Sequence, residues 1–369
     1  MINKNKEINF INDKDVYDGL ISSRLKITQD LLHEILIERG VIVSPREDRD
    51  ELVSYISMLS NDLYDIDFLI AQLEPPSRKE KMTSFDLSVD LSKDEVRKLF
   101  KDIQKESQNI NDVYSFGSTG KESKVKVNVE HEERDLSRTR LRQRKIVESD
   151  IEIEISDNNI RVRGPSNEKT TEITEKFISK VSVYKKIEPV VKAIDISSFD
   201  SNERTKFFIK LIDGLEGFSL KDVIKVSVDS KENLKIRSGC VIDETGVDEI
   251  EEEQEVLGVL KNAILSGESL LSSPEYQELK KRGFYITKII WKSSEVKLDG
   301  SLVVFEAAIG DIPVGKKFIY NVLGSHNSTK EGYTKTRRPI SSDDRDRYIS
   351  ALENAAYKVM DKIMTGKGG

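Results

Sequence analysis

The chain has 369 residues, which is too long for one ordinary small domain and predicts two or three. A charged fraction of 34% with a net charge of −7 excludes coating of nucleic acid by bulk attraction, so any nucleic-acid site must be a local basic patch. The single cysteine, Cys240, excludes an internal disulfide and favours the reducing cytoplasm. No stretch approaches the roughly 20 apolar residues of a membrane span, and the first residues lack the apolar core of a signal peptide. We therefore expect an intracellular protein without a membrane partner.

The first third of the chain has apolar residues at helical spacing. Thr28 is placed to cap one helix, Gly40 to end it, and Pro45 to precede a second. Two further helices follow by the same spacing. Residues 1–106 therefore predict an all-helical domain, and the polar, glycine-dotted residues 107–123 predict a linker.

Beyond residue 123 the apolar period changes to two, which is typical of half-exposed strands. Ile151, Ile153 and Ile155 alternate in this way before a turn at 157–159, which predicts a hairpin. The later elements mix strands with helices, and a long helix starting near Ser341 ends the chain. We therefore expect an α+β fold, in which an all-helical N-terminal domain is followed by an α+β region with mostly antiparallel sheet and a long C-terminal helix.

The α+β region is predicted to span residues 124–369, as one domain or as two divided near 240–255. The division is suggested by the carboxylate-rich run 243–255, which is most simply a solvated face. A helix is expected directly after this run, with Ile264 on its apolar side.

Residues 27–57 form a pattern of their own: a helix ending in Arg39-Gly40, a short extended link, and a second helix that starts with basic residues. This pattern resembles the SAP-type helix–extended-loop–helix module, a small DNA-binding fold. The residues that carry the resemblance are Leu31, Leu32, Leu36, Arg39, Gly40, Ser44, Arg49, Leu52 and Ile56.

The resemblance implies docking on DNA at the start of the second helix, where arginines would join the helix dipole in holding a phosphate. The predicted contacts of this patch are Arg24, Lys26, Arg39, Arg46 and Arg49. Neighbouring carboxylates would weaken its field, namely Glu47, Asp48, Asp50 and Glu51. A helical hairpin that docks on a partner protein is the alternative.

Two further basic clusters are candidate phosphate contacts. Residues 138–145 read RTRLRQRK, and an extended backbone would direct to one face Arg138, Arg140, Arg142 and Arg144. Pairing with carboxylates across a sheet is the alternative. The second cluster is a predicted loop in which Tyr333 would stack a base, and its cations are Lys330, Lys335, Arg337 and Arg338. A solvated loop without a function is the alternative there.

No catalytic or cofactor motif is complete. Residues 117–121 look like part of a phosphate-binding loop, but Glu122 stands where Ser or Thr is required. The histidines lack metal-ligand spacing. Asp299 with Glu306 has the spacing of a metal-dependent nuclease core, but Ala308 replaces the expected lysine. We therefore expect no metal and no cofactor.

Three functional hypotheses follow, in order of preference. The first is a non-catalytic nucleic-acid-associated protein, whose helical domain contacts DNA and whose α+β region binds a partner or a ligand. The second is a protein–protein adaptor or a subunit of a larger complex. Accessory proteins of host defence, phages and mobile elements often show equally few recognisable motifs. The third is a divergent metal-dependent nuclease that uses Asp299 and Glu306.

Overall fold

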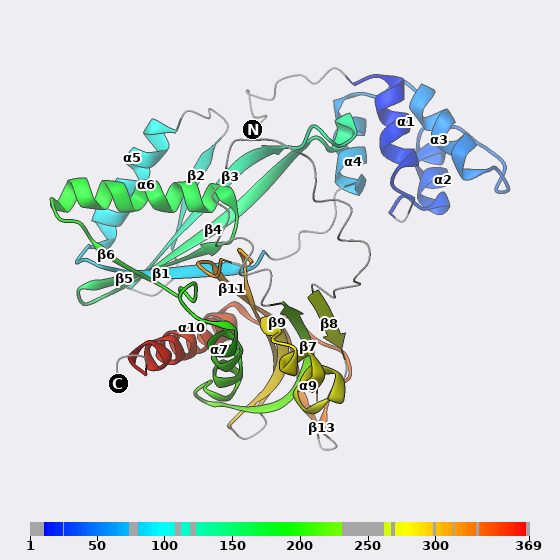
Figure 1. The fold of residues 1–369 in the computed structure, drawn as a ribbon. Helices are drawn as coiled ribbons and strands as arrows, with labels where there is room; N and C mark the ends of the chain where they lie inside the picture. Colours follow the sequence, from blue (N-terminus) through cyan, green and yellow to red (C-terminus); the bar gives the residue numbers. More distant parts are fainter. Residues whose placement is uncertain are drawn as a thin grey trace, which may run out of the picture. The chain divides into compact units, whose positions relative to one another are not determined.

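The computed structural model divides the chain into two compact units (Figure 1). The first unit contains Met1–Lys79 and Lys93–Ile151, and the second unit contains Glu80–Ser92 and Glu152–Gly369. The described residues are 11–24, 26–73, 80–107, 112–118, 123–230, 262–266, 270–297, 300–312, 314–329 and 332–366.

The first unit begins with four helices around an apolar core. Their bounds are α1 (Asp13–Ile21), α2 (Gln29–Glu38), α3 (Arg49–Met58) and α4 (Leu63–Leu73). The Thr28 hydroxyl accepts a hydrogen bond from the Leu31 amide, as expected for a helix cap. Gly40 follows α2 with φ of 74°, a conformation that favours glycine. Leu141, from the short 3₁₀ helix η1 (Arg140–Arg142), is buried in the same core.

The remainder of the first unit pairs strands beneath a helix. Its elements are α5 (Lys93–Glu106), β2 (Val113–Ser118), β3 (Lys124–Arg134) and the beginning of β4 (Arg144–Ser156). β2 pairs antiparallel with β3, and α5 lies against both. The alternation of β3 buries Val125, Val127 and Val129, as its sequence period predicts.

The second unit is a mostly antiparallel sheet with helices. Its strands are the end of β4, β1 (Met82–Ser88), β5 (Asn159–Pro165), β6 (Val190–Ala193), β7 (Phe218–Asp229), β8 (Asn262–Ser266), β9 (Tyr285–Glu295), β10 (Leu302–Ile309), β11 (Phe318–His326), β12 (Ser328–Thr329) and β13 (Gly332–Tyr333). Its helices are α6 (Glu168–Lys185), α7 (Ser201–Asp213), η2 (Leu270–Ser272), α9 (Pro274–Lys281) and α10 (Ser342–Thr365). From the end of β4 the strands run β4-β5-β1-β11-β10-β9-β7-β8, with β6 also on β1, while β12 and β13 pair separately.

Two helices, α7 and α10, cover one face of this sheet and enclose its main core (Figure 1). α10 contacts α7 and β11, and α7 contacts β9. Trp291 stacks on Phe305 with ring centroids 5.5 Å apart, and both side chains are fully buried. Tyr348 of α10 packs against Phe305 with ring centroids 6.3 Å apart. Burying an apolar side chain stabilises a fold by about 1.5–3 kcal/mol relative to exposure, so apolar contacts hold α10 on the sheet.

The expected fold class is confirmed: helices come first, the sheet is mostly antiparallel, and a long helix ends the chain. The hairpin is also present, since β4 pairs with β5 around Asp157 and Asn158, and Asn158 takes the left-handed conformation that its residue type tolerates. Within the described residues, no helix combines the length and the apolar character needed to cross a membrane.

Three local expectations differ from the structure. β1 interrupts the stretch 1–106 that was expected to be all-helical, because its residues pair on both sides with strands distant in sequence. β2 lies inside the expected linker 107–123, where glycine and serine mask a short alternation that buries Tyr114. Ile264 lies in β8 and not in a helix, because that segment pairs with β7. The acidic run 243–255 lies outside the described residues.

Candidate functional site

The SAP-like arginines Arg39 and Arg49 are used inside the first unit. Arg39 donates to Asn61 Oδ1 at 2.8 Å and lies 2.8 Å from the Asp65 carboxylate. Arg49 donates to the carbonyl of Leu20 at 2.8 Å. Only 18% of the Arg39 side chain and 15% of the Arg49 side chain are exposed. Both guanidinium groups therefore hold helices together.

The other residues of this predicted patch are placed differently. The Nη2 atom of Arg24 donates to both oxygens of the Asp50 carboxylate, at 3.2 and 3.1 Å. The Lys26 ammonium donates to the Leu73 carbonyl at 2.9 Å. Arg46 is exposed in the link between α2 and α3. The five cations therefore do not form one free patch.

The basic run 138–145 is not extended, so the expected single-faced comb of arginines is wrong. Arg138 lies in a turn and donates to Asp135 at 2.7 Å, while Arg140 and Arg142 belong to η1. Arg144 starts β4, and its Nε lies 3.4 Å from the Glu132 carboxylate. The chain bends here because Leu141 enters the helical core. A prediction that assumes a straight strand with alternating side chains cannot show this bend.

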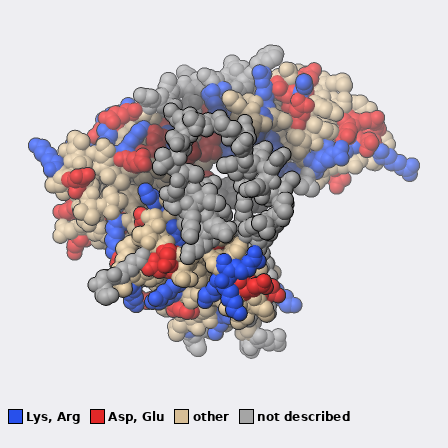
Figure 2. Space-filling view, in the orientation of Figure 1, with Lys and Arg blue, Asp and Glu red and all other residues tan. Residues whose placement is uncertain are grey.

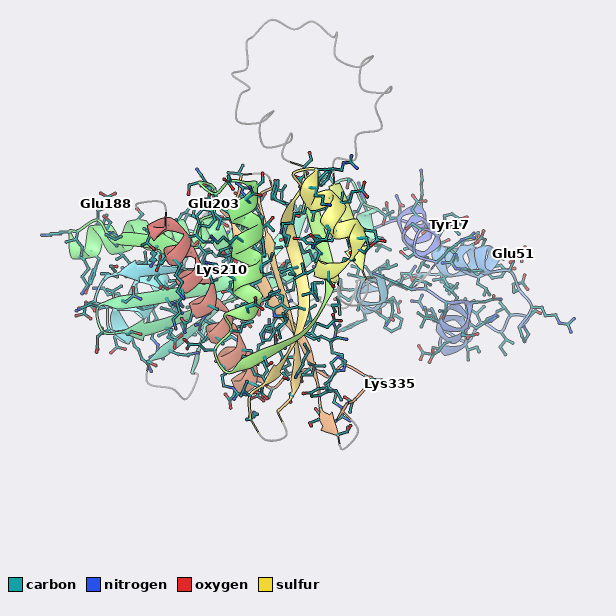
Figure 3. The ribbon with its side chains drawn as sticks, turned by 60° about the horizontal axis from the view of Figure 1, so that its bottom comes forward. Tyr17, Glu51, Glu188, Glu203, Lys210 and Lys335 are labelled. Atoms are coloured by element: carbon teal, nitrogen blue, oxygen red, sulfur yellow. The ribbon has the colours of Figure 1, made fainter. Side chains whose placement is uncertain are left out.

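The third cluster, in the loop after β13, is the most accessible of the three. Its cations Lys335, Arg337 and Arg338 are exposed, and none has an ion pair with another described residue. Figure 3 labels Lys335 on this loop. Lys330, which belongs to the same predicted cluster, lies outside the described residues.

The backbone of this loop is fixed to β11. Ser325 and Arg338 exchange two backbone hydrogen bonds, of 3.0 and 2.8 Å. The His326 ring nitrogen Nδ1 lies 2.7 Å from the carbonyl of Thr334. Tyr333, in β13, is also exposed. The loop thus presents an aromatic ring and three cations from an ordered frame. These residues stay a predicted site.

Gly324 makes the close approach of this loop possible. Its φ of +151° belongs to the region that favours glycine. A Cβ at this position would lie 2.6 Å from Arg337 Cγ and 2.8 Å from the Arg338 carbonyl oxygen. A glycine inside a strand often marks such an approach, and this was the one sequence signal for the geometry of the loop.

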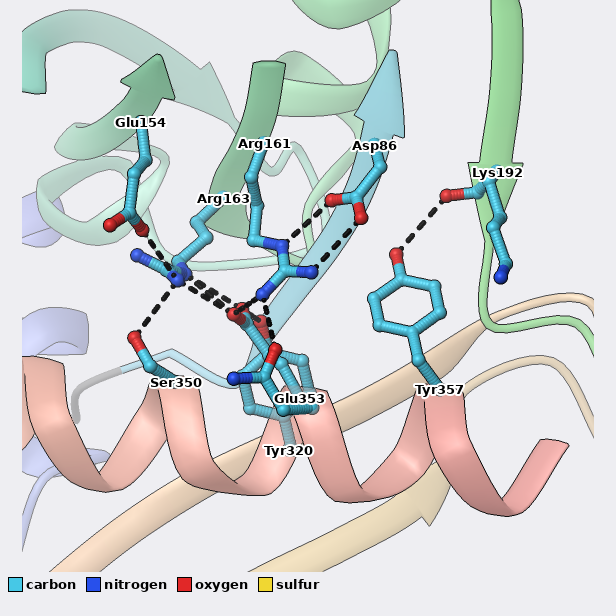
Figure 4. A network of polar contacts seen from close by, with 10 residues as sticks. Asp86, Glu154, Arg161, Arg163, Lys192, Tyr320, Ser350, Glu353 and Tyr357 are labelled. Carbon is cyan, nitrogen blue, oxygen red and sulfur yellow. Dashed lines mark hydrogen bonds and ion pairs between the residues drawn. The ribbon is translucent and has the colours of Figure 1, made fainter. Parts of the chain in front are cut away.

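A network of buried polar groups joins α10 to β5, β1 and β11 (Figure 4). Arg163 donates to both Glu353 carboxylate oxygens at 2.8 Å, and the Tyr320 hydroxyl donates to Glu353 Oε1. Arg161 forks onto Asp86 at 2.7 and 2.9 Å. Arg163, Glu353 and Tyr320 are buried, so these charges compensate one another away from water.

The pKa shifts in this network follow from burial and pairing. Burial, reinforced by the nearby Glu353 charge, raises the pKa of Tyr320 well above its ordinary value. The hydrogen bond to Asp86 raises the pKa of Arg161. Burial by itself would lower the pKa of Arg163, but the attraction of the Glu353 carboxylate outweighs this effect, so the pKa of Arg163 is raised overall. The raised pKa values of Tyr320, Arg161 and Arg163 mean that these three groups hold their protons tightly, and the network fastens α10 to the sheet.

Sequence reasoning missed this network. Its signal is a carboxylate within an apolar stripe: Glu353 follows Ile349 and Leu352 and precedes Ala356 on the buried side of α10. A charge in such a position needs a buried partner. The identity of that partner, Arg163, is set by pairing across the fold.

Glu306, one of the two residues of the nuclease hypothesis, is buried on β10 between two lysines. Lys288 Nζ lies 2.5 Å away and Lys81 Nζ 3.2 Å away. Burial by itself would raise the pKa of Glu306, but the two lysines lower it overall. Asp299 lies outside the described residues. Within the described part of the chain, no group of three or more His, Cys, Asp and Glu side chains is arranged to hold a metal ion.

Surface charge is mixed on the face seen in Figure 2, where Lys and Arg side chains alternate with Asp and Glu side chains. Comparison with protein-family models finds no match, and no curated protein is significantly similar to the chain.

Proposed function

We propose that this chain is a nucleic-acid-associated protein that contacts phosphates through the loop after β13. The observation that supports the proposal is the combination of exposure and order at Lys335, Arg337 and Arg338. A backbone already tied to β11 loses little conformational freedom when the side chains bind, so more of the attraction appears as affinity. Tyr333 adds a surface on which an unpaired base stacks.

The loop is preferred over the SAP-like patch for an energetic reason. For Arg39 or Arg49 to bind a phosphate, each must give up contacts inside the first unit: Arg39 those with Asn61 and Asp65, and Arg49 those with the Ile27 and Leu20 carbonyls. The loop cations exchange only water for phosphate, and the counterions released from the nucleic acid favour binding. The proposal thus moves the nucleic-acid contact from the helical region to the α+β region.

The test is a salt titration of the full chain against a labelled DNA duplex and a labelled single strand. Replacing Lys335, Arg337 and Arg338 by alanine removes up to three phosphate contacts, so the slope of log K against log salt becomes shallower by about 0.9 per lost contact for duplex. Fluorescence anisotropy at several salt concentrations measures this slope.

The matched control removes the same charge from another exposed surface, at the end of α9, with Lys280, Lys281 and Arg282 replaced by alanine. We expect that variant to keep most of the wild-type slope. Equal loss in both variants would mean that net charge, and not the loop, governs binding. Absence of binding by the wild-type chain at low salt would refute the proposal.

Protein docking is a second candidate function, favoured by a separate observation on α4. Large apolar side chains of this helix are exposed, which is typical of a surface that another molecule covers. The two functions are compatible in one chain, because the loop and α4 belong to different units.

A further inference from the structure

Strand β6 pairs with another strand on one side only. It lies antiparallel to β1, in a register that joins Val190 to Ser88 and Ala193 to Phe85. Among the described residues, no strand pairs with the other side of β6. Alternate residues of an antiparallel strand direct their N–H and C=O groups to opposite sides, so β6 also has backbone donors and acceptors on its outer side. Such an edge can pair with a further strand.

Helix α10 contacts β6 without covering this edge. The Tyr357 hydroxyl donates to the Lys192 carbonyl at 3.1 Å, and the Lys192 ammonium lies 2.8 Å from the Asp361 carboxylate. A carbonyl oxygen has two lone pairs and an ammonium has three donors, so neither group of Lys192 is saturated by these contacts. All four residues of β6 are exposed. The strand is therefore held by β1 and α10 and stays open to solvent.

The side chains at this edge are mainly apolar. Val190 is 67% exposed and Val191 is 47% exposed, although successive residues of a strand point to opposite faces. Both faces of β6 are therefore open to solvent. Exposed apolar side chains continue from the strand back to the end of α6, at Val183, Tyr184 and Ile187. An exposed apolar strand edge is a surface on which another strand adds.

We name residues 187–193 the β6 edge, and its charges suit a second copy of the same chain. Two copies related by a two-fold axis pair antiparallel across such an edge. With the axis at Val190, Glu188 of each copy lies opposite Lys192 of the other, on the same face of the sheet. Glu188 is exposed beside the end of α6 (Figure 3), and it has no ion pair with another described residue. Pro189 favours an extended backbone at Glu188, as this pairing requires.

The neighbouring symmetric registers lack this complementarity. An axis at Pro189 would place Lys186 opposite Lys192, which is a repulsive pair. An axis at Val191 would place the apolar Val190 opposite Lys192 and leave Glu188 without a cation. The register with Val190 on the axis is thus the one that joins opposite charges twice and apolar side chains at the centre.

We infer that the β6 edge pairs with the β6 edge of a second copy, so that two chains form a dimer with one continuous sheet. Backbone hydrogen bonds satisfy the outer side of β6, and the exposed apolar side chains of the two copies cover one another. The two Glu188–Lys192 pairs set the register. The inference does not depend on the nucleic-acid proposal, because the β6 edge and the loop after β13 share no residue.

Sedimentation velocity of the full chain over a wide concentration range tests the inference. We expect a species with twice the mass of one chain, whose share rises with concentration. A chain that stays monomeric up to its highest soluble concentration would overturn the inference.

Charge reversal at the two opposed positions tests the partner and the register together. Glu188→Lys by itself places like charges opposite each other twice in the dimer, and so does Lys192→Glu. We expect either variant to raise the Kd of the dimer at least about tenfold. An equimolar mixture of the two variants restores both pairs of opposite charges, so we expect a mixed dimer with a Kd near that of the wild-type chain. Energy transfer between differently labelled variants detects it.

The control is Glu175→Lys, which makes the same change of charge at an exposed position on α6 in the same unit and should keep the wild-type Kd. Circular dichroism checks the fold of each variant. Glu188→Lys decides alone if Lys192→Glu does not fold beside Asp361. A wild-type Kd in folded Glu188→Lys protein would overturn the inference. Failure of two folded variants to form the mixed dimer would overturn it as well, because the partner or the register would then be different.

Discussion

At the scale of single residues, Glu353 shows how one buried charge depends on its surroundings. Its carboxylate accepts hydrogen bonds from Arg163 and Tyr320, and both partners are buried. The pair is not itself proof of high stability, because removing two charges from water offsets their attraction. Breaking it from one side is different, since the buried Arg163 charge then keeps only the partly exposed Glu154 as a partner.

We therefore predict that Glu353→Gln lowers the free energy of unfolding by up to about 3–5 kcal/mol, because Arg163 stays buried and charged with only the partly exposed Glu154 as counter-ion. Urea denaturation followed by circular dichroism measures the change. The control is Glu216→Gln, which removes an exposed ion pair with Lys358 and should leave the midpoint unchanged. Similar small shifts in both variants would show that Glu353 is not the anchor of α10.

Tyr276 is a second informative residue. Its side chain is buried and its hydroxyl has no hydrogen-bond partner among the described residues. Burial raises the pKa of Tyr276 to about 12. Because the pKa in the folded state is above that of the unfolded chain, the folded state binds the proton more tightly. This contribution to stability is complete below about pH 10 and is lost as the pH rises toward 12.

We predict that Tyr276→Phe keeps or slightly raises stability at pH 8, because the substitution removes a buried hydroxyl without a partner. Between pH 10 and about 12 the variant should lose stability less steeply than the wild-type chain. Urea midpoints at the two ends of this range measure both effects. Parallel curves would contradict the prediction. The raised pKa values of Tyr285 and Tyr348 leave some alkaline loss in either protein.

At the scale of elements, the loop after β13 and strand β11 act as one structure. The backbone bonds between Ser325 and Arg338 set where the cations lie, and Gly324 leaves the space for Arg337 to pass. Helix α10 is also positioned by its neighbours. Contacts with α7 and β11 bury its apolar side, and the hydrogen bonds from Arg163 of β5 to Glu353 fix its orientation on the sheet. Single elements are thus positioned by contacts that belong to their neighbours.

We predict that Gly324→Ala weakens nucleic-acid binding in the direction of the loop variant without removing a charge. The new methyl group would lie 2.6 Å from Arg337 Cγ, and the φ of +151° is strained for alanine, so the loop must move. Anisotropy titration measures affinity, and circular dichroism checks the sheet. Gly117→Ala is the control, because its nearest contact would be an ordinary 3.6 Å. Wild-type affinity in a folded Gly324→Ala protein would contradict the prediction, because binding would then not depend on the position of the loop.

At the scale of the whole molecule, the exposed basic residues do not lie where the sequence predicted a DNA contact. The net charge is −7, and the helical segment that resembles a DNA-binding module carries carboxylates beside its arginines. The exposed cations of the loop after β13 belong to the other unit. Attraction to nucleic acid must then be local, and repulsion by the acidic remainder makes it sensitive to salt.

Local sequence determined the fold class and many element boundaries. The cap at Thr28, the alternation of Val125, Val127 and Val129, and the turn at Asn158 all act within a few residues of themselves. Such features can be read directly because backbone hydrogen bonding and side-chain period are short-range. β2 escaped because its alternation is brief and glycine-containing.

Tertiary structure alone decided which charges are available. Arg39 meets Asp65, Arg49 meets the Leu20 carbonyl, and Arg163 meets Glu353, across separations in sequence that no local period encodes. Whether an arginine is a phosphate contact or a structural tie depends on the acceptors that folding brings to it. By itself, the sequence of this protein therefore determined its elements and its supply of basic side chains. Folding decided that the SAP-like arginines are largely occupied, that the cations after β13 are exposed, and that α4 exposes apolar side chains.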